Sequence, residues 1–188
     1  MKIYEYDNYE HYVQEQTKAN IRKLGWVYVT ERSIDNIKSL QPEANAIICH
    51  GTRNGAEQKM FQQRYPNAEI IGTEISETAT QFPMTVQWDF TNQKDEWVGK
   101  FDIVYSNAFD HSMDPEATLK TWVDQMSPEG CLFIEHSESP INNVSSAADP
   151  LEISHRELEL MFTRFGLIIF NRTPGKRSES IVFGMRKK

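Results

Sequence analysis

Two glycines and an acid occupy chemically suggestive positions in this sequence. The apolar run Ala44–Cys49 leads into His-Gly-Thr-Arg-Asn-Gly, which contains Gly51 and Gly55. Glycine tolerates positive φ and lets backbone amides approach a ligand at a helix N-terminus. The next apolar run ends at Glu74, 19 residues after Gly55, where a carboxylate can accept hydrogen bonds from both hydroxyls of a ribose. This spacing predicts a site for a nucleoside-containing ligand.

Groups able to carry out acid–base chemistry follow the later apolar runs. Asp110 and His111 come shortly after the fourth run, and His136 follows the fifth run beside Glu135. Histidine changes its charge near neutral pH, so His111 suits the role of general base, with Asp110 orienting it and His136 as a second candidate. The four residues could also hold a divalent ion. Because no short ligand repeat like those of zinc sites accompanies them, we expect no metal.

These side chains need a framework that brings strand ends together. Short β-rich apolar runs alternate with helical patterns, which is typical of a doubly wound, mainly parallel α/β sheet with helices on both faces. Such sheets bind ligands outside the carboxyl ends of their strands. The turn signal Arg172–Gly175 separates the last two runs, so we expect these two to pair antiparallel. The runs are 44–49, 68–73, 85–88, 101–105, 131–135, 167–171 and 178–185.

Helix signals lie between the runs. Asp114 and Pro115 supply an N-cap and a first helical proline, and Ser154 with Glu157 predicts a capping box. A weaker helix is expected after Gly55. Residues 1–40 are expected to form an N-terminal helical appendage or lid, and residues 41–188 the ligand-binding domain, within a single domain overall. The polar segment 138–150 is expected to be a long, functional loop.

A dinucleotide is one ligand that a glycine-containing turn of this kind could bind. The dinucleotide fingerprint needs a second glycine that leaves room for a pyrophosphate. Arg53 stands at that position, and its side chain would fill the space. The dinucleotide hypothesis therefore fails at its most demanding position.

A second hypothesis comes from the order of several short motifs. They are Cys49–Gly55 (for acid-x-G-x-G-x-G), Gly72–Ser76, Trp88–Phe90, Phe101–Asn107, Asp110–Pro115 and Pro128–Gly130. In this order and spacing, from about Ala44 to Phe183, the chain resembles the class I S-adenosylmethionine-dependent methyltransferases. The resemblance implies a Rossmann-like sheet of seven strands with an antiparallel last strand, and S-adenosyl-L-methionine as the cofactor.

The resemblance also implies roles for residues after the second, third and fourth runs. Glu74 would bind the ribose, and Ile75 would pack on the adenine. Asp89 would accept a hydrogen bond from the adenine amino group, with Phe90 beside it. Asn107 would lie near the methionine portion and the methyl group.

The loop that would hold the amino-acid end of the cofactor departs from the family pattern. Gly51, Thr52, Arg53 and Gly55 are its expected cofactor-binding residues. Cys49 stands where the family has an acid, and Arg53 replaces the middle glycine. The guanidinium of Arg53 is suited to the carboxylate of the cofactor.

Composition limits the possible partners. The net charge of −7 over 188 residues argues against tight, sequence-independent binding to nucleic acids. Basic residues gather between Arg172 and Lys188, and we interpret them as a solvated edge. Apolar runs reach four residues, whereas about 20 are needed to span a bilayer. With no visible secretory signal and only two cysteines, we expect a cytoplasmic protein with reduced thiols.

The resulting hypothesis is methyl transfer from S-adenosylmethionine to an oxygen or nitrogen of a small-molecule or carbohydrate-like acceptor. Selection of the acceptor is expected to fall to residues 1–40, to the loop 137–150 and to the final hairpin. Two alternatives stay open because one architecture carries many activities. The first is an inactive binding or scaffold module that descends from such enzymes, and the second is a nicotinamide-dependent oxidoreductase.

Overall fold

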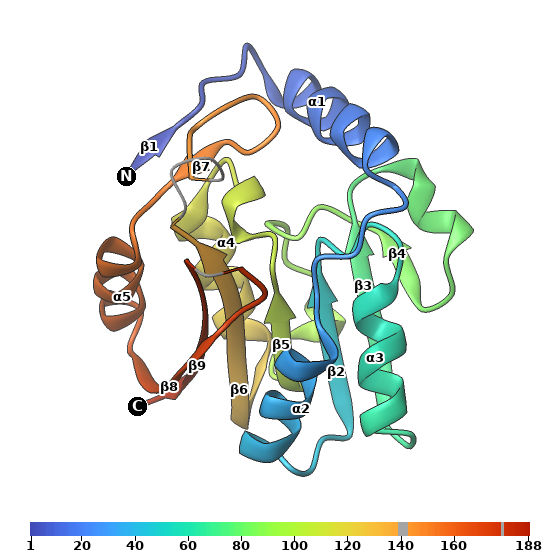
Figure 1. Ribbon diagram of the computed structural model, residues 1–188, viewed down its shortest axis with the longest axis vertical. Helices are drawn as coiled ribbons and strands as arrows, with labels where there is room; N and C mark the ends of the chain where they lie inside the picture. The colour runs from blue at the N-terminus through green and yellow to red at the C-terminus, as the bar shows by residue number, and fades with distance from the viewer. Residues whose placement is uncertain (139–142, 178) are drawn as a thin grey trace.

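A seven-stranded mixed sheet forms the centre of the molecule in the computed structural model, which describes residues 1–138, 143–177 and 179–188 (Figure 1). Its strand order is β4-β3-β2-β5-β6-β9-β8, and neighbours are parallel except in the two pairs that involve β9. The predicted fold class is confirmed. The strands are β2 (Ala46–His50), β3 (Glu69–Glu74), β4 (Thr85–Gln87), β5 (Phe101–Ser106), β6 (Met126–Ser137), β8 (Leu167–Pro174) and β9 (Ser180–Lys187).

Helices cover both faces of the sheet. Along β2, the fully buried Ile47 and Cys49 belong to one hydrophobic cluster and Ile48 to the other, because successive side chains point to opposite faces. Buried residues of α2 and α3 complete the first cluster, and those of α4 and α5 complete the second. The helices are α2 (Glu31–Leu40), α3 (Ala56–Arg64), α4 (Pro115–Gln125) and α5 (His155–Arg164).

The predicted caps set the helix boundaries. The Asp114 side chain accepts a hydrogen bond from the backbone N–H of Ala117 at 3.0 Å, and Pro115 begins α4. Ser154 and Glu157 form both hydrogen bonds of the predicted capping box at the start of α5. These local signals fix where the chain leaves each strand-end loop.

The N-terminal segment covers the carboxyl ends of the strands. Figure 1 shows α1 (Tyr9–Arg22) lying across this end of the sheet. β1 (Lys2–Ile3) pairs antiparallel with β7 (Leu151–Glu152), so the segment before α5 is tied to the N-terminus. No helix in the described ranges combines the length and hydropathy that crossing a membrane requires. Short 3₁₀ helices complete the fold: η1 (Glu77–Gln81), η2 (Asp95–Trp97) and η3 (Phe109–His111).

The structure differs from the expectation at a few strand boundaries. β6 begins at Met126, because Met126 already pairs with Phe101 before a register shift places Cys131 opposite Ile103. β1 and β7 were not predicted from the sequence. Residues 139–142 of the predicted loop and residue 178 of the predicted last strand lie outside the described residues.

Candidate functional site

The loop after β2 has a left-handed backbone at three positions. Gly51 has φ of 70° and Gly55 has φ of 74°, and Arg53 between them has φ of 46°. A Cβ atom on Gly51 would lie 2.5 Å from the Cβ of Ala108, so only glycine fits there. A left-handed backbone costs a non-glycine residue about 1–2 kcal/mol. Arg53 therefore keeps the conformation of the glycine expected at its position and adds a side chain to it.

A cavity of about 470 Å³ lies between this loop and α1. A buried face of α1 with Tyr12, Gln16, Ala19 and Asn20 forms its wall on one side. The structure brings together at this cavity four residues from two separate sequence motifs. They are Glu74, Ile75, Asp89 and Phe90.

Two carboxylates of the smaller cavity are held by backbone amides. Glu74 accepts hydrogen bonds from the backbone N–H of Arg53 at 3.1 Å and of Ser76 at 2.9 Å. Asp89 accepts one from Thr91 N–H and one from the Tyr9 hydroxyl, both at 2.9 Å. Each carboxylate has about four lone-pair positions, so both keep capacity for a ligand. Burial, and then the charge of Asp89, raises the pKa of Tyr9 to about 12, so this phenol stays a donor.

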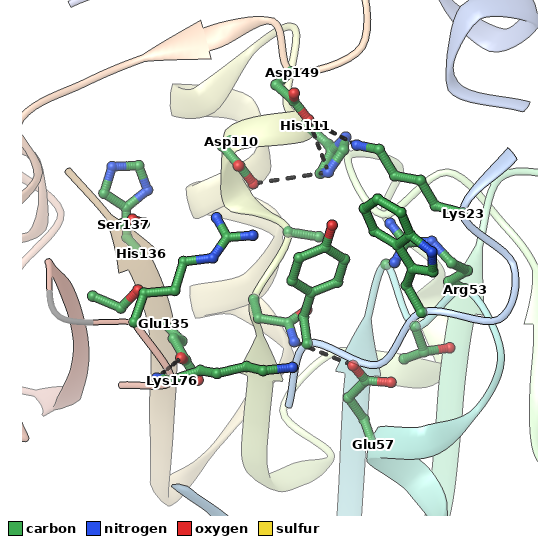
Figure 2. Close-up of a pocket in the computed structure, with 18 of the residues that line it drawn as sticks. Lys23, Arg53, Glu57, Asp110, His111, Glu135, His136, Ser137, Asp149 and Lys176 are labelled. Carbon is green, nitrogen blue, oxygen red and sulfur yellow. Dashed lines mark hydrogen bonds and ion pairs between the residues drawn. The ribbon is translucent and has the colours of Figure 1, made fainter. Parts of the chain in front are cut away.

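A second cavity, of about 940 Å³ (Figure 2), has several lining residues in common with the first. Arg53 and His111 line both cavities. The second cavity also holds Asn107, Asp110 and His136, which the sequence placed after β5 and β6. Thr52 lines this cavity as well, whereas Gly55 is the N-cap of α3 and lines neither. All the expected site residues but one thus line two cavities that share Arg53 and His111.

Glu57 is a candidate binding residue that was missed from the sequence. Its side chain lines the larger cavity, is only 5% exposed, and accepts a hydrogen bond from the Asn107 amide at 3.2 Å. Glu57 Oε2 and Arg53 Nε are both buried without a hydrogen-bond partner in the described part of the chain. Burial raises the pKa of Glu57 to about 7. A buried carboxyl and a half-buried guanidinium thus flank the loop, each with one polar atom that has no partner in the described residues.

His111 has a defined orientation in the larger cavity. Its Nδ1 lies 2.9 Å from Oε1 of Gln16, whose amide nitrogen faces the carbonyl oxygens of Ala147 and Ala148. Because Gln16 Oε1 only accepts, Nδ1 carries the proton and the lone pair of a neutral His111 is on Nε2. Nε2 faces the carboxylate of Asp149 at 3.5 Å. Gln16, which was not predicted, makes the orienting hydrogen bond.

Asp110, His111 and Asp149 form a small polar cluster at one end of the cavity. Figure 2 shows both carboxylates directed toward the imidazole, with Asp110 Oδ1 4.0 Å from its Nε2. Their ligand atoms lie within 4.8 Å of one another, so this trio differs from the metal set considered from the sequence. The Lys23 ammonium lies 3.8 Å from Asp149 and already supplies positive charge there.

His136 is buried against the backbone. Its Nε2 donates to the carbonyl of Ile153 at 2.9 Å, and burial lowers its pKa, so the ring is neutral at pH 7. Its neighbour Glu135 accepts a hydrogen bond from the backbone N–H of Lys176 at 2.7 Å. Lys176, which is exposed, and Arg177, which is half-buried, also line the cavity, so part of the basic C-terminal edge borders the site. The hairpin turn folds them back against β6, which a count of charges does not reveal.

His50, the last residue of β2, is buried below the site. Its ring is stacked on Trp122 at 4.9 Å and contacts the side chains of Thr73 and Gln125 at 3.0 and 2.8 Å. Burial lowers its pKa to about 3. Both cysteines are buried and free, and burial raises the pKa of Cys49 well above its usual value.

Comparison with known proteins adds information at the level of the fold. No protein-family model matches the chain, and no curated protein matches it in sequence. The 1,6-didemethyltoxoflavin-N1-methyltransferase of Burkholderia thailandensis, crystallised with 1,6-didemethyltoxoflavin and S-adenosylhomocysteine, matches with a TM-score of 0.75 and 14% identity over 98% of this chain and 92% of that chain.

Two further structures agree with this match. The glycopeptide N-methyltransferase MtfA complexed with S-adenosyl-L-methionine has a TM-score of 0.62 at 10% identity, over 87% of this chain and 96% of that one. An S-adenosylmethionine-dependent methyltransferase from Clostridium acetobutylicum has a TM-score of 0.63 at 9% identity, over 84% of this chain and 90% of that chain. The chain therefore has the Rossmann-like fold found in S-adenosylmethionine-dependent methyltransferases.

Proposed function

We propose that this protein transfers a methyl group from S-adenosylmethionine to an oxygen or nitrogen of a small-molecule acceptor. The observation that carries the proposal is that Glu57 and Arg53 line one cavity beside the loop after β2, each with a buried polar atom that has no hydrogen-bond partner in the described residues. An α-amino acid end carries an ammonium and a carboxylate, and these charges match the two side chains. Methyltransferases of the same fold bound to S-adenosylmethionine or S-adenosylhomocysteine support the same ligand.

The smaller cavity suits the adenosine part of that ligand. Glu74 would accept the ribose hydroxyls on the lone pairs that its two backbone amides leave available. Ile75 and Phe90 would pack on the adenine, and Asp89 would accept from the adenine amino group. Tyr9 already donates to Asp89, so α1 would close over the nucleoside.

The larger cavity suits the methyl acceptor. When bound, S-adenosylmethionine supplies an electrophilic methyl group on a sulfonium. His111 Nε2 would take the proton of the acceptor hydroxyl or amine as the new bond to carbon forms and the S–C bond breaks. Asp149 and Asp110 lie 3.5 and 4.0 Å from Nε2, where they would stabilise the resulting imidazolium. Asn107 would help to align the reacting groups, which supplies much of the acceleration in a displacement of this kind.

Glu57 and Arg53 argue against the oxidoreductase alternative. A nicotinamide dinucleotide would place its pyrophosphate at this loop, where the Arg53 side chain fills space and Glu57 would repel it once ionised. The fold alone does not distinguish an enzyme from an inactive descendant, so the alternative of a binding module is decided by experiment.

Isothermal titration calorimetry tests the proposed ligand directly. We expect saturable 1:1 binding of S-adenosylmethionine and S-adenosylhomocysteine, and no enhancement of NADH fluorescence on mixing. Glu74→Gln is expected to weaken binding, because an amide accepts fewer hydrogen bonds than a carboxylate. The exposed Glu129→Gln is the matched control. Absence of binding by both adenosyl compounds would reject the proposal.

Release of S-adenosylhomocysteine with a panel of small phenols and amines tests for catalysis. With an acceptor in hand, His111→Ala is expected to lower turnover about 100-fold or more, as for loss of a general base. Binding of S-adenosylhomocysteine should change little, because the Nε2 atom of His111 points toward Asp110 and Asp149, which line the larger cavity. Unchanged turnover would remove His111 from the role of base, and His136→Ala is the next variant to examine.

A further inference from the structure

Three cations surround one aromatic ring in the larger cavity. Arg53 Cζ lies 5.1 Å, Lys176 Nζ 5.6 Å and Arg177 Cζ 5.2 Å from the centre of the Tyr28 ring. We name Arg53, Lys176 and Arg177 the Tyr28 cation cluster. All of them, and Tyr28 itself, line the cavity. Like charges this close repel one another, and the negative face of an aromatic ring offsets only part of that repulsion.

The Tyr28 cation cluster makes no close ion pair with an acid in the described residues. Within the part of the chain that the structure describes, no carboxylate oxygen lies within 4.0 Å of a charged nitrogen of the cluster. Some other cations do pair, as Arg64 does with Asp35 and Arg172 does with Glu159, each at 2.9 Å or less. The cluster instead gathers three cations around one ring in a chain whose net charge is −7.

The acids that line the same cavity make no ion pair with the cluster at 4.0 Å or less, and Glu57 and Glu135 interact with Arg53 and Lys176 only at longer range. Asp110 and Asp149 face the imidazole of His111 at the opposite end of the view in Figure 2 from Lys176. Glu135 accepts the backbone N–H of Lys176, and burial raises the pKa of its carboxyl. A carboxyl held toward its neutral form compensates less positive charge.

The hairpin turn between β8 and β9 holds the cations in place before any ligand binds. Gly175 N–H donates to the Ser180 carbonyl at 2.8 Å, and a Cβ on Gly175 would lie 2.5 Å from Glu135 Oε1. The Lys176 ammonium donates to the Val27 carbonyl, which joins the turn to the segment before α2. A site formed in advance loses little conformational freedom on binding.

We propose that Lys176 and Arg177 bind an oxyanion, a carboxylate or a phosphate, carried by the methyl acceptor. The guanidinium of Arg177 offers a planar pair of donors to two oxygens, and Lys176 adds a point charge. Arg53 is assigned to the carboxylate of the cofactor. Its positive charge also attracts the anion, but the proposal does not require Arg53 to contact it. That the anion belongs to the methyl acceptor rests on the proposed function, whereas the anion site itself does not.

Three matched probes test the site: benzoate, phenyl phosphate and the uncharged benzamide. Their binding is measured by calorimetry or saturation-transfer NMR at low salt, with and without S-adenosylhomocysteine. We expect at least one of the two anions to bind tenfold or more tightly than benzamide. Arg177→Gln is expected to weaken the binding of that anion fivefold or more, and Arg177→Lys is expected to retain part of the affinity. Arg186→Gln, an exposed position at the other end of β9, is the control that removes the same charge.

Each outcome is decisive for the anion site. Preference for phenyl phosphate or for benzoate identifies the oxyanion as phosphate or carboxylate. Benzamide binding as tightly as both anions, or equal affinities in wild-type and Arg177→Gln proteins whose thermal unfolding is the same, would overturn the proposal. If the anions bind and S-adenosylhomocysteine does not, the proposed function fails and the anion site remains. If S-adenosylhomocysteine binds and the anions do not, the anion site alone is rejected.

Discussion

Replacing Glu57 by glutamine is expected to stabilise the protein at alkaline pH while weakening the proposed cofactor site. Burial raises the pKa of Glu57 from 4.5 to about 7, and one pKa unit corresponds to about 1.4 kcal/mol. The ionised carboxylate therefore lowers the free energy of unfolding by about 3 kcal/mol at pH 8. Glutamine keeps the shape, stays neutral at every pH, and removes this penalty.

The sign of the pH dependence follows from the two pKa values. Between about pH 4.5 and 7, the unfolded chain has lost the Glu57 proton and the folded protein retains it. Stability therefore falls as pH rises through this window. Urea unfolding of wild-type and Glu57→Gln proteins should give equal free energies near pH 4.5 and a difference approaching 3 kcal/mol at pH 8. The exposed Glu129→Gln should show no such growing difference.

Cofactor affinity should change in the opposite direction. A bound ammonium favours the ionised form of Glu57, so binding below pH 7 would release a proton. In the wild-type protein, affinity for S-adenosylhomocysteine should rise as pH increases from 6 to 8, and in Glu57→Gln this rise should be lost. A variant that is no more stable at pH 8, or that binds as tightly and with the same pH dependence as wild type, would refute the reasoning.

Three further substitutions test the loop and its surroundings. Gly51→Ala should lower the free energy of unfolding by roughly 2–4 kcal/mol, measured by urea unfolding, because it combines a positive φ with a Cβ contact of 2.5 Å. Arg53→Gly should change the free energy of unfolding by no more than about 1 kcal/mol, because relief of backbone strain offsets the lost contact with Tyr28. The same substitution should weaken the binding of S-adenosylhomocysteine tenfold or more in calorimetry. Tyr9→Phe should lower the free energy of unfolding by about 1 kcal/mol, because one hydrogen bond to Asp89 is lost. It should also tighten the binding of adenosine, because Asp89 Oδ2 becomes available. Weaker binding of adenosine would contradict the adenine role of Asp89.

Much of the fold was predictable because its signals are local. The strands buried on both faces, such as Ala46–His50, read as continuous apolar runs, and the caps at Asp114 and Ser154 lie within a few residues of the helices they begin. β1 and β7 carry no such signal. Each has only two residues, and they form because tertiary contacts bring Lys2 and Glu152 together.

The site was predictable where topology alone decides position. Glu74 and Asp89 follow parallel neighbours, so a sheet of this order brings them to one edge. Glu57 was missed because acids are common in the first turn of any helix, where they interact favourably with the helix dipole. Gln16 was missed because 95 residues separate it from His111, and no local pattern links the two.

The neutral side chain of Cys49 is compatible with a carboxylate at Glu57. The family pattern has an acid at the position of Cys49, whose thiol here is fully buried and has its pKa raised by burial and then by the charge of Glu57. Two carboxylates at these positions would repel each other, and the pKa of one of them would be strongly raised. A neutral Cys49 spares Glu57 this additional repulsion and leaves Glu57 and Glu74 as buried carboxyls beside Arg53. The acid missing from β2 is thus replaced, on this reasoning, by one from the first turn of α3.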